Sequence, residues 1–137
     1  MGKSNVILGG DLNLILTMGE VWGENPKQDA LSAFFLYFFE KGNLVDVVPL
    51  KLEPTWRNNR GAQSIFKILD HFMVVENILN GNLILRSTIE TGGNFDHRPI
   101  SLIVRVPDKK PLLLLNSIPC GWRRTNTDLK FKMPRNP

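Results

Sequence analysis

Short apolar runs, each ended by a residue that favours turns, are the feature that most limits how this chain can fold. Most runs are rich in Val, Ile and Leu and stop near Gly, Pro or Asn, as the strands of a sheet do. Segment 29–42 instead predicts a helix, with Asp29 as its N-cap and Gly42 as its stop. Its apolar residues recur at helical spacing: Leu31, Phe34, Phe35 and Phe38. The whole pattern predicts a mixed α/β fold.

The expected strands can be placed along the chain. They lie at 5–8, 44–48, 65–75, 83–89 and 100–106, with a hairpin over 55–65 whose polar turn is near 59–61, and a further turn near 80–81. The first strand is expected to stop at Gly9-Gly10 and to be followed by a loop over 11–24. From Pro107 onward Pro, Lys, Arg and Asn replace the apolar pattern. We therefore expect a folded portion at 1–106 and a basic, irregular tail at 107–137.

The charge is unevenly divided between these two parts. The net charge is +4, but residues 1–104 hold nine basic against eleven acidic residues, a net of −2. Residues 105–137 hold eight basic against two acidic residues, a net of +6. A basic tail can hold phosphates without sequence preference, although most such tails are solvated ends.

Membrane insertion and disulfide bonding are not expected. The longest apolar run, 34–39, is far shorter than the about 20 apolar residues of a spanning helix. We therefore expect a soluble chain with no membrane partner. Cys120 is the only cysteine, which excludes a disulfide framework or a cysteine zinc site within one chain. A single cysteine favours a reducing, intracellular compartment only weakly.

Polar side chains suited to phosphodiester chemistry interrupt or follow the apolar runs. Cleaving a phosphodiester needs a hard divalent cation held by carboxylates, a base for the attacking water, and donors that stabilise charge on the phosphate. The residue types that can do this are Asp11, Asn13, Asp70, Asp96 and His97. Their spacing alone does not show that they meet in space.

Each of these residues also has a purely structural interpretation. Asp11 and Asn13 follow two glycines and could simply form a turn. His97 could be a histidine that is hydrogen-bonded in a loop. Asp70 has bulky apolar neighbours, so we expect it to be buried with a partner, because an unpaired buried carboxylate is costly.

In their order along the chain, four motifs resemble one known family. They are Gly10-Asp11-Leu12-Asn13, Pro54-Thr55-Trp56-Arg57, Leu69-Asp70 and Asp96-His97-Arg98-Pro99. The set resembles the second half of the endonuclease/exonuclease/phosphatase superfamily, and GGDLN, PTWRNNRG and DHRPISL are similar to the endonuclease domain of plant non-LTR (LINE-type) retrotransposons. The resemblance covers roughly residues 6–106. It implies part of a four-layer α/β sandwich, of which 1–106 would be the C-terminal portion.

The resemblance also implies a role for each matched residue. Asp11 would position or activate the attacking water, and Asn13 would hold the scissile phosphate. Asp70 would orient the catalytic histidine, His97, which contacts the phosphate or acts as base. Asp96 would lie at the metal site.

Further expectations follow from the same family. The cofactor would be Mg²⁺ or Mn²⁺, with no small-molecule cofactor, and the partner would be DNA, which retrotransposon members nick to prime reverse transcription. The chain would be nuclear if it keeps that role. Secondary candidates for contacts on the DNA side are Trp56, Arg57, Asn58 and Arg98.

The sequence departs from the family pattern in three places. Family members carry a preceding half with an Asn and a metal-binding Glu, whereas here the strand leading to Asp11 comes first. Phe95 stands where the family usually has Ser, and Ile68 where these retrotransposon enzymes usually have Arg. We therefore expect the isolated chain to have little or no nuclease activity and to need the missing half.

Three other interpretations remain open. The chain could be a non-catalytic nucleic-acid-binding remnant that uses basic tail residues such as Arg123, Arg124 and Lys130. It could be a phosphatase for lipid or nucleotide phosphates, since the superfamily includes such enzymes. It could also be a decayed gene product without function.

Overall fold

The computed structural model describes residues 5–58, 63–91, 96–109, 111–118 and 121–125. In these residues the mixed α/β class is confirmed, and the strand pairings are antiparallel. The elements in chain order are β1 (Ile7–Asp11), η1 (Met18–Glu20), β2 (Val21–Trp22), α1 (Ser32–Lys41), β3 (Leu44–Asp46), β4 (Trp56–Arg57), β5 (Phe66–Lys67), β6 (Asp70–Val75), α2 (Glu76–Leu79), β7 (Ile84–Ile89), β8 (Ile100–Arg105), β9 (Pro111–Ile118) and β10 (Gly121–Thr125).

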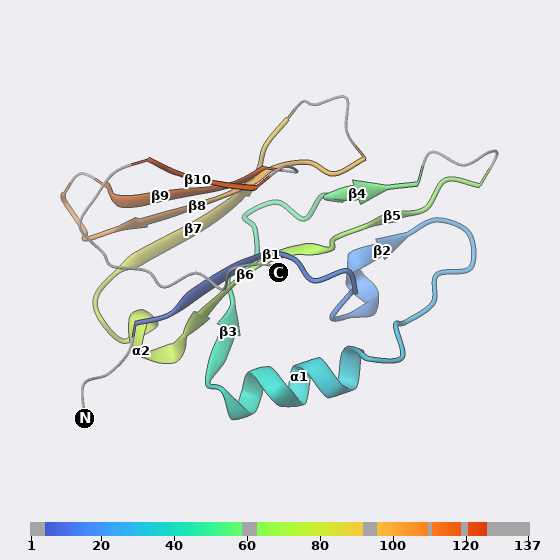
Figure 1. Ribbon diagram of the computed structural model, residues 1–137, viewed down its shortest axis with the longest axis horizontal. Helices are drawn as coiled ribbons and strands as arrows, with labels where there is room; N and C mark the ends of the chain where they lie inside the picture. The colour runs from blue at the N-terminus through green and yellow to red at the C-terminus, as the bar shows by residue number, and fades with distance from the viewer. Residues whose placement is uncertain (1–4, 59–62, 92–95, 110, 119–120, 126–137) are drawn as a thin grey trace.

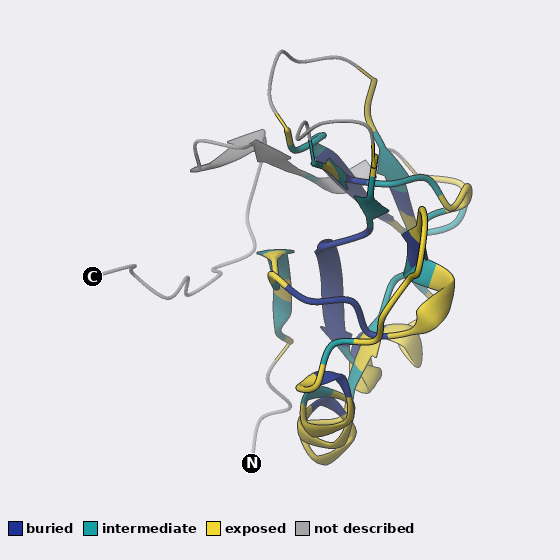
Figure 2. Ribbon diagram, turned by 90° about the vertical axis from the view of Figure 1, so that its right-hand side faces the viewer, coloured by how far each residue is buried: buried dark blue, intermediate teal, exposed yellow. Residues whose placement is uncertain are grey.

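Strand β6 lies at the centre of the fold, between β1 and β3 in a three-stranded sheet. Its residues are buried along almost its whole length, as Figure 2 shows. The pairing with β1 runs from Ile7 opposite Val74 to Asp11 opposite Asp70. This register brings two of the predicted acidic residues to the same end of the sheet.

The largest core lies between this sheet and a second, four-stranded sheet of order β10-β9-β8-β7. Phe72 and Val74 of β6 pack there with Ile100, Leu102 and Val104 of β8. Side chains alternate across a strand, so the same face of β6 also carries Asp70. Figure 1 shows the four-stranded sheet above β6 and helix α1 below it.

Helix α1 covers the opposite face of β6. Phe39, with the half-buried Phe35, packs in a cluster that contains Met73 of β6. The helix is confirmed and ends at Gly42, but it turns a different face inward from the one its spacing suggested, because Phe34 and Phe38 remain exposed.

The predicted N-cap of α1 is wrong. Leu31 occupies that position without a side-chain cap, and the Asp29 carboxylate instead accepts a hydrogen bond from the Ile15 amide (2.8 Å). An N-cap side chain accepts hydrogen bonds from the first amides of its helix. Here the Asp29 carboxylate instead bonds the loop around Ile15 to the segment that precedes the helix. Ser32 adds a second tie, since its buried hydroxyl donates to the Ile15 carbonyl.

A third, small sheet has the order β2-β5-β4. The predicted hairpin is confirmed, because β4 pairs with β5; its predicted turn at 59–61 lies outside the described residues. The single long strand expected at 65–75 is wrong. The Ile68 amide bonds to the Glu20 carbonyl and the Leu69 amide to the Thr55 hydroxyl, so the chain leaves one sheet and enters another.

Two expectations near the N-terminus also need correction. The first strand does not stop at the glycine pair but runs through it to Asp11. The segment 11–24 is not all loop, since it holds η1 and β2. A short helix, α2, precedes the turn expected at 80–81.

The expectation of an irregular tail from 107 is wrong for β9 and β10, which join the four-stranded sheet beside β8. The apolar run 112–115 provides residues suited to a sheet, and the edge of β8 provides unpaired backbone groups to receive them. The boundary placed at residue 106 therefore falls inside one sheet. Among the described residues, no helix combines the length and the apolar character needed to cross a bilayer.

Candidate functional site

Asp70 and His97 meet at the edge between the two larger sheets. His97 lies just before β8, held by a bridge to Trp56 of β4. The His97 Nδ1 atom is 3.0 Å from the Asp70 Oδ2 atom. An ionised carboxylate can only accept, so with Asp70 ionised the Nδ1 atom of His97 is the donor of this pair. The Asp70 side chain is 7% exposed and that of His97 is 22% exposed, so only the histidine reaches solvent.

Asp11 completes a group of three side chains. Its Oδ2 atom lies 3.8 Å from the His97 Nε2 atom, and its side chain is 43% exposed. Each of Asp11, Asp70 and His97 offers a ligand atom, and these atoms lie within 4.8 Å of one another. The group therefore has the atoms and spacing to hold a divalent cation or to move a proton.

Asn13 adjoins the group through the backbone. Its amide donates to the Asp11 Oδ1 atom (2.7 Å), and it has a left-handed backbone, with φ of 55°. Both features are typical of a turn built by Asp and Asn. The two residues therefore form a turn, which leaves Asn13 exposed next to Asp11; whether they also have a catalytic role stays a prediction.

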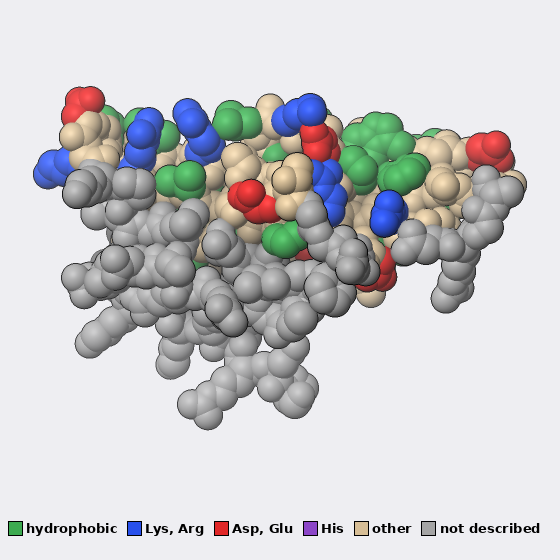
Figure 3. Space-filling model, turned by 90° about the horizontal axis from the view of Figure 1, so that it is seen from above, with side chains coloured by type: hydrophobic (Ala, Val, Ile, Leu, Met, Phe, Trp, Pro, Cys, Tyr) green, Lys and Arg blue, Asp and Glu red, His purple; other side chains and the backbone are tan. Residues whose placement is uncertain are grey.

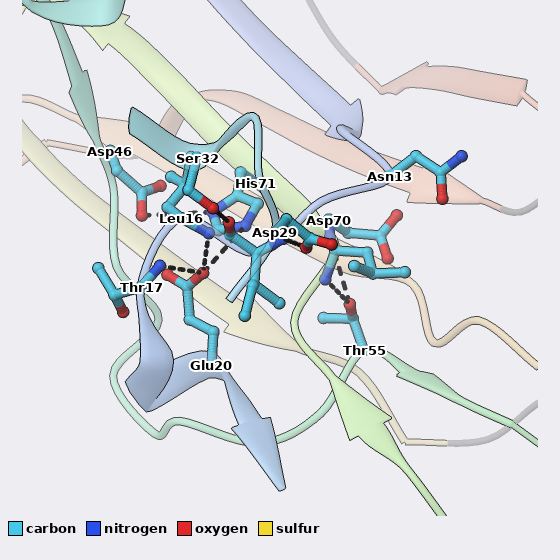
Figure 4. A network of polar contacts seen from close by, with 12 residues as sticks. Asn13, Leu16, Thr17, Glu20, Asp29, Ser32, Asp46, Thr55, Asp70 and His71 are labelled. Carbon is cyan, nitrogen blue, oxygen red and sulfur yellow. Dashed lines mark hydrogen bonds and ion pairs between the residues drawn. The ribbon is translucent and has the colours of Figure 1, made fainter. Parts of the chain in front are cut away.

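Thr55 is a site residue that the sequence reasoning missed. It is fully buried, and its hydroxyl oxygen accepts hydrogen bonds from the amides of Leu69 (3.0 Å) and Asp70 (3.2 Å) (Figure 4). The Arg98 amide in turn donates to the Thr55 carbonyl (2.6 Å). Thr55 thus joins the segment before β4, the segment carrying His97 and the start of β6. The only sequence feature that could have pointed to Thr55 is its position in the motif Pro54-Thr55-Trp56-Arg57.

Burial sets the protonation of Asp70. Loss of solvent raises the pKa of its carboxyl group, and the negative charge of Asp11 acts in the same direction. Hydrogen bonds from His97 and Thr55 oppose this but do not cancel it, so the pKa lies above its ordinary value.

Asp96 is not brought into this group. Its side chain is exposed and belongs to neither cluster of His, Asp and Glu ligands found among the described residues. Its carbonyl accepts a hydrogen bond from the Arg57 amide (3.1 Å). The assignment of Asp96 to a metal site stays a prediction.

Most of the secondary candidates have structural contacts. Trp56 packs against the core of the small sheet, and Asn58 exchanges hydrogen bonds with Ile65 across the hairpin. Arg98 pairs with Glu53 (2.8 Å) and donates to the Glu90 carbonyl. Arg57 has an exposed side chain and is the one best placed for an outside partner.

The charge of the described surface is mixed. In Figure 3 the face seen from above carries both Lys or Arg and Asp or Glu side chains, and several Lys and Arg side chains follow one another along its left half. Electrostatic attraction of a nucleic acid would therefore depend on local groups there.

A second group of polar side chains lies on the other face of β6. It consists of Glu20, Asp46 and His71. No motif in the sequence combines these residues, which come from η1, β3 and β6.

Comparison with known protein families, with curated proteins and with solved structures finds no match to this chain.

Proposed function

We propose that this chain provides the second half of the active site of a metal-dependent DNA endonuclease of the endonuclease/exonuclease/phosphatase type, derived from a LINE-type retrotransposon. One observation carries the proposal: Asp11, Asp70 and His97, far apart in the sequence, lie together at one end of the central sheet. The resemblance assigns catalytic roles to the same three residues.

The two antiparallel sheets packed over a common core, with α1 outside, are compatible with part of a four-layer α/β sandwich. The proposed active end of that sandwich is where the last residue of β1 pairs with the first residue of β6, next to the segment before β8. Phosphodiesterase chemistry there needs an opening for a bulky polymer, and the exposure of Asp11 and Asn13 meets this need.

The roles proposed for the side chains follow from their contacts. Asp70 holds Nδ1 of His97, which fixes the ring and leaves Nε2 to meet the phosphate. Asp11, more exposed than Asp70, orients the attacking water and draws its proton. As the water oxygen bonds to phosphorus, the nucleotide oxygen leaves with the electron pair of the broken P–O bond. The Asn13 amide is proposed to hold a phosphate oxygen.

The oxygen donors present fit Mg²⁺ or Mn²⁺. We propose that Asp11, whose ligand atom lies within 4.8 Å of those of Asp70 and His97, would help to hold the ion, and the resemblance assigns the metal site to Asp96. Both carboxylates are exposed enough to exchange water for an ion. When bound, the cation neutralises charge on the phosphate. The Glu and Asn that the family places before this region have no counterpart among the motifs of these 137 residues. We therefore propose that the chain is impaired on its own.

The experiment is Mg²⁺-dependent nicking of supercoiled plasmid, after circular dichroism has shown that the chain is folded. The chain is tested alone and joined to the first half of a related LINE endonuclease domain. We expect little or no nicking alone, clear nicking in the joined protein, and loss of nicking on His97→Ala. Arg86→Ala, an exposed change on β7, is the matched control.

Two results would count against this proposal. Nicking by the isolated chain that disappears on Asp96→Ala would show that no further half is needed. A folded joined protein without activity would show that the chain does not supply working catalytic residues.

The uneven charge favours a second candidate, a non-catalytic nucleic-acid-binding remnant that uses the basic residues of 105–137. Binding through phosphates alone is salt-sensitive. Under this alternative DNA binding survives Asp11→Asn and His97→Ala but is lost when Arg123, Arg124 and Lys130 are replaced together by Ala.

A further inference from the structure

The cluster of Glu20, Asp46 and His71 is separate from the proposed catalytic group. Successive side chains of β6 point to opposite faces, so Asp70 faces the four-stranded sheet and His71 faces the side covered by α1. Figure 4 shows Glu20, Asp46 and His71 converging, with Glu20 reaching up from the η1 turn. The catalytic proposal uses none of these three residues.

The three side chains are held in place by independent contacts. The His71 Nδ1 atom lies 3.3 Å from the Asp46 Oδ2 atom. The Glu20 Oε2 atom accepts hydrogen bonds from the amides of Leu16 (2.6 Å) and Thr17 (3.3 Å). These contacts fix both carboxylates before any ligand arrives. An ionised carboxylate has about four lone-pair sites, so two backbone donors leave others available.

Two buried atoms in the cluster lack a hydrogen-bond partner. They are the His71 Nε2 and Asp46 Oδ1 atoms. The His71 side chain is 2% exposed, and its Nε2 atom points toward Glu20 Oε2 at 3.9 Å, too far for a hydrogen bond. A buried polar group without a partner is costly, so this arrangement needs something to satisfy it.

We propose that Glu20, Asp46 and His71 form a second cation site, which binds a divalent transition ion such as Zn²⁺ in preference to Mg²⁺. One nitrogen and two carboxylate donors suit Zn²⁺, whereas Mg²⁺ requires oxygen ligands and keeps most of its water. Two carboxylates beside a neutral imidazole balance the charge of such an ion.

The dimensions of the cluster agree with this assignment. Ligand atoms of the three residues lie within 4.8 Å of one another. Zn²⁺ binds His and carboxylate at about 2.0–2.2 Å, which sets tetrahedral donors about 3.4 Å apart, so each pair of donors needs to close by at most about 1.4 Å. The Asp46 side chain is 21% exposed and that of Glu20 12% exposed, which leaves a route from solvent.

A bound ion would join three parts of the chain. Glu20 lies in the turn after the loop that begins at Asp11, Asp46 ends β3, and His71 is in β6. The ion would thus fix the loop behind the catalytic carboxylate without touching the substrate. Its role is structural and does not depend on nuclease activity.

A proton is the competing way to satisfy this cluster. Burial alone lowers the pKa of His71, but the hydrogen bond and charge of Asp46, with the charge of Glu20, outweigh it and leave the pKa raised. A protonated His71 would bring a single positive charge and donate from both ring nitrogens. The two occupants can be separated by experiment.

The test is calorimetric titration of the folded, metal-free chain with Zn²⁺ in excess Mg²⁺. We expect Zn²⁺ binding that persists in excess Mg²⁺ and in the His97→Gln variant, together with a higher melting temperature. Glu20→Gln and Asp46→Asn, which keep the side-chain shape, should each weaken Zn²⁺ binding by about tenfold or more. His97→Gln is the matched control, because it removes a ligand from the catalytic group and should leave this binding intact.

Nitrogen NMR of the histidine rings in the unaltered chain decides the result even if a variant fails to fold. Added Zn²⁺ should shift a His71 ring nitrogen and stop that ring from titrating near neutral pH. The proposal is overturned if Zn²⁺ leaves the His71 signals unchanged, or if binding is lost in His97→Gln and kept in Glu20→Gln.

Discussion

The two faces of β6 place the same chemical groups in opposite surroundings. Toward the four-stranded sheet, His97 joins the buried Asp70 to the exposed Asp11, so the histidine reaches solvent. Toward α1, His71 itself is buried, and its carboxylate partners come from the loop and the neighbouring strand. A histidine at the edge of a sheet can meet a substrate, whereas the buried His71 is out of reach of one. The difference suits catalysis on one face and structure on the other.

Thr55→Val should have the largest effect on stability. It leaves the buried amides of Leu69 and Asp70 without an acceptor, and each unsatisfied group costs about 1–3 kcal/mol. We expect a loss of roughly 3 kcal/mol in the free energy of unfolding, measured by urea denaturation. Thr55→Ser keeps the hydroxyl and is the control. If Val and Ser destabilise equally, the hydroxyl does not support the catalytic face.

The pH dependence of stability should distinguish the two faces in metal-free buffer. The folded pKa of His71 is raised above its ordinary value of 6.5, so its contribution to stability is full below pH 6.5 and is lost as pH rises through the folded pKa. His71→Gln should remove this decline on the alkaline side, seen as a flatter curve of melting temperature against pH. An unchanged curve would show that His71 carries no linked proton.

Asp70→Asn should have a smaller effect, and of opposite sign to Thr55→Val. The folded pKa of Asp70 is raised above 3.8, so the unaltered chain loses stability as pH rises from 3.8 through that folded value. The uncharged amide avoids this loss, and we expect the variant to be as stable as the parent or more stable at neutral pH. Nicking by the joined protein should still fall, because His97 loses its carboxylate. Destabilisation at pH 7 but not at pH 4 would contradict this account.

Arg57→Ala should change stability least. The side chain is exposed, and such substitutions alter the free energy of unfolding by less than about 0.5 kcal/mol. If Arg57 contacts a phosphate, DNA binding weakens for all sequences and the slope against salt falls by about one. Arg86→Ala is the matched control. If both substitutions change DNA binding equally, Arg57 makes no specific contact with DNA.

The sequence predicted the local structure well wherever local signals decide it. The apolar spacing in 29–42 and the stop at Gly42 located α1, and the β-branched runs located β3, β7 and β8. The predictions from local signals were wrong where contacts between distant segments decide which residues form a strand. The chain divides into β5 and β6 because the amides between them donate hydrogen bonds to Glu20 and Thr55. Strand β9 forms because it can pair with the edge of β8.

The same distinction holds for the candidate sites. Asp11, Asp70 and His97 were chosen by residue type and by resemblance, and the fold brings them together. Asp96, chosen in the same way, belongs to neither ligand cluster among the described residues. The roles of Thr55 and of the cluster on the other face could not be predicted, because their partners lie 14 or more residues away along the chain.

By itself, the sequence determined which residues can bind a cation, accept a proton or end a strand, because these properties belong to the side chain and its immediate neighbours. Only the tertiary structure decided that Asp70 faces one sheet and His71 the other side of β6, and how deeply each is buried. That outcome depends on strand register and on packing between distant segments. A shift of one residue along β6 would exchange the two faces, and with them the two sites.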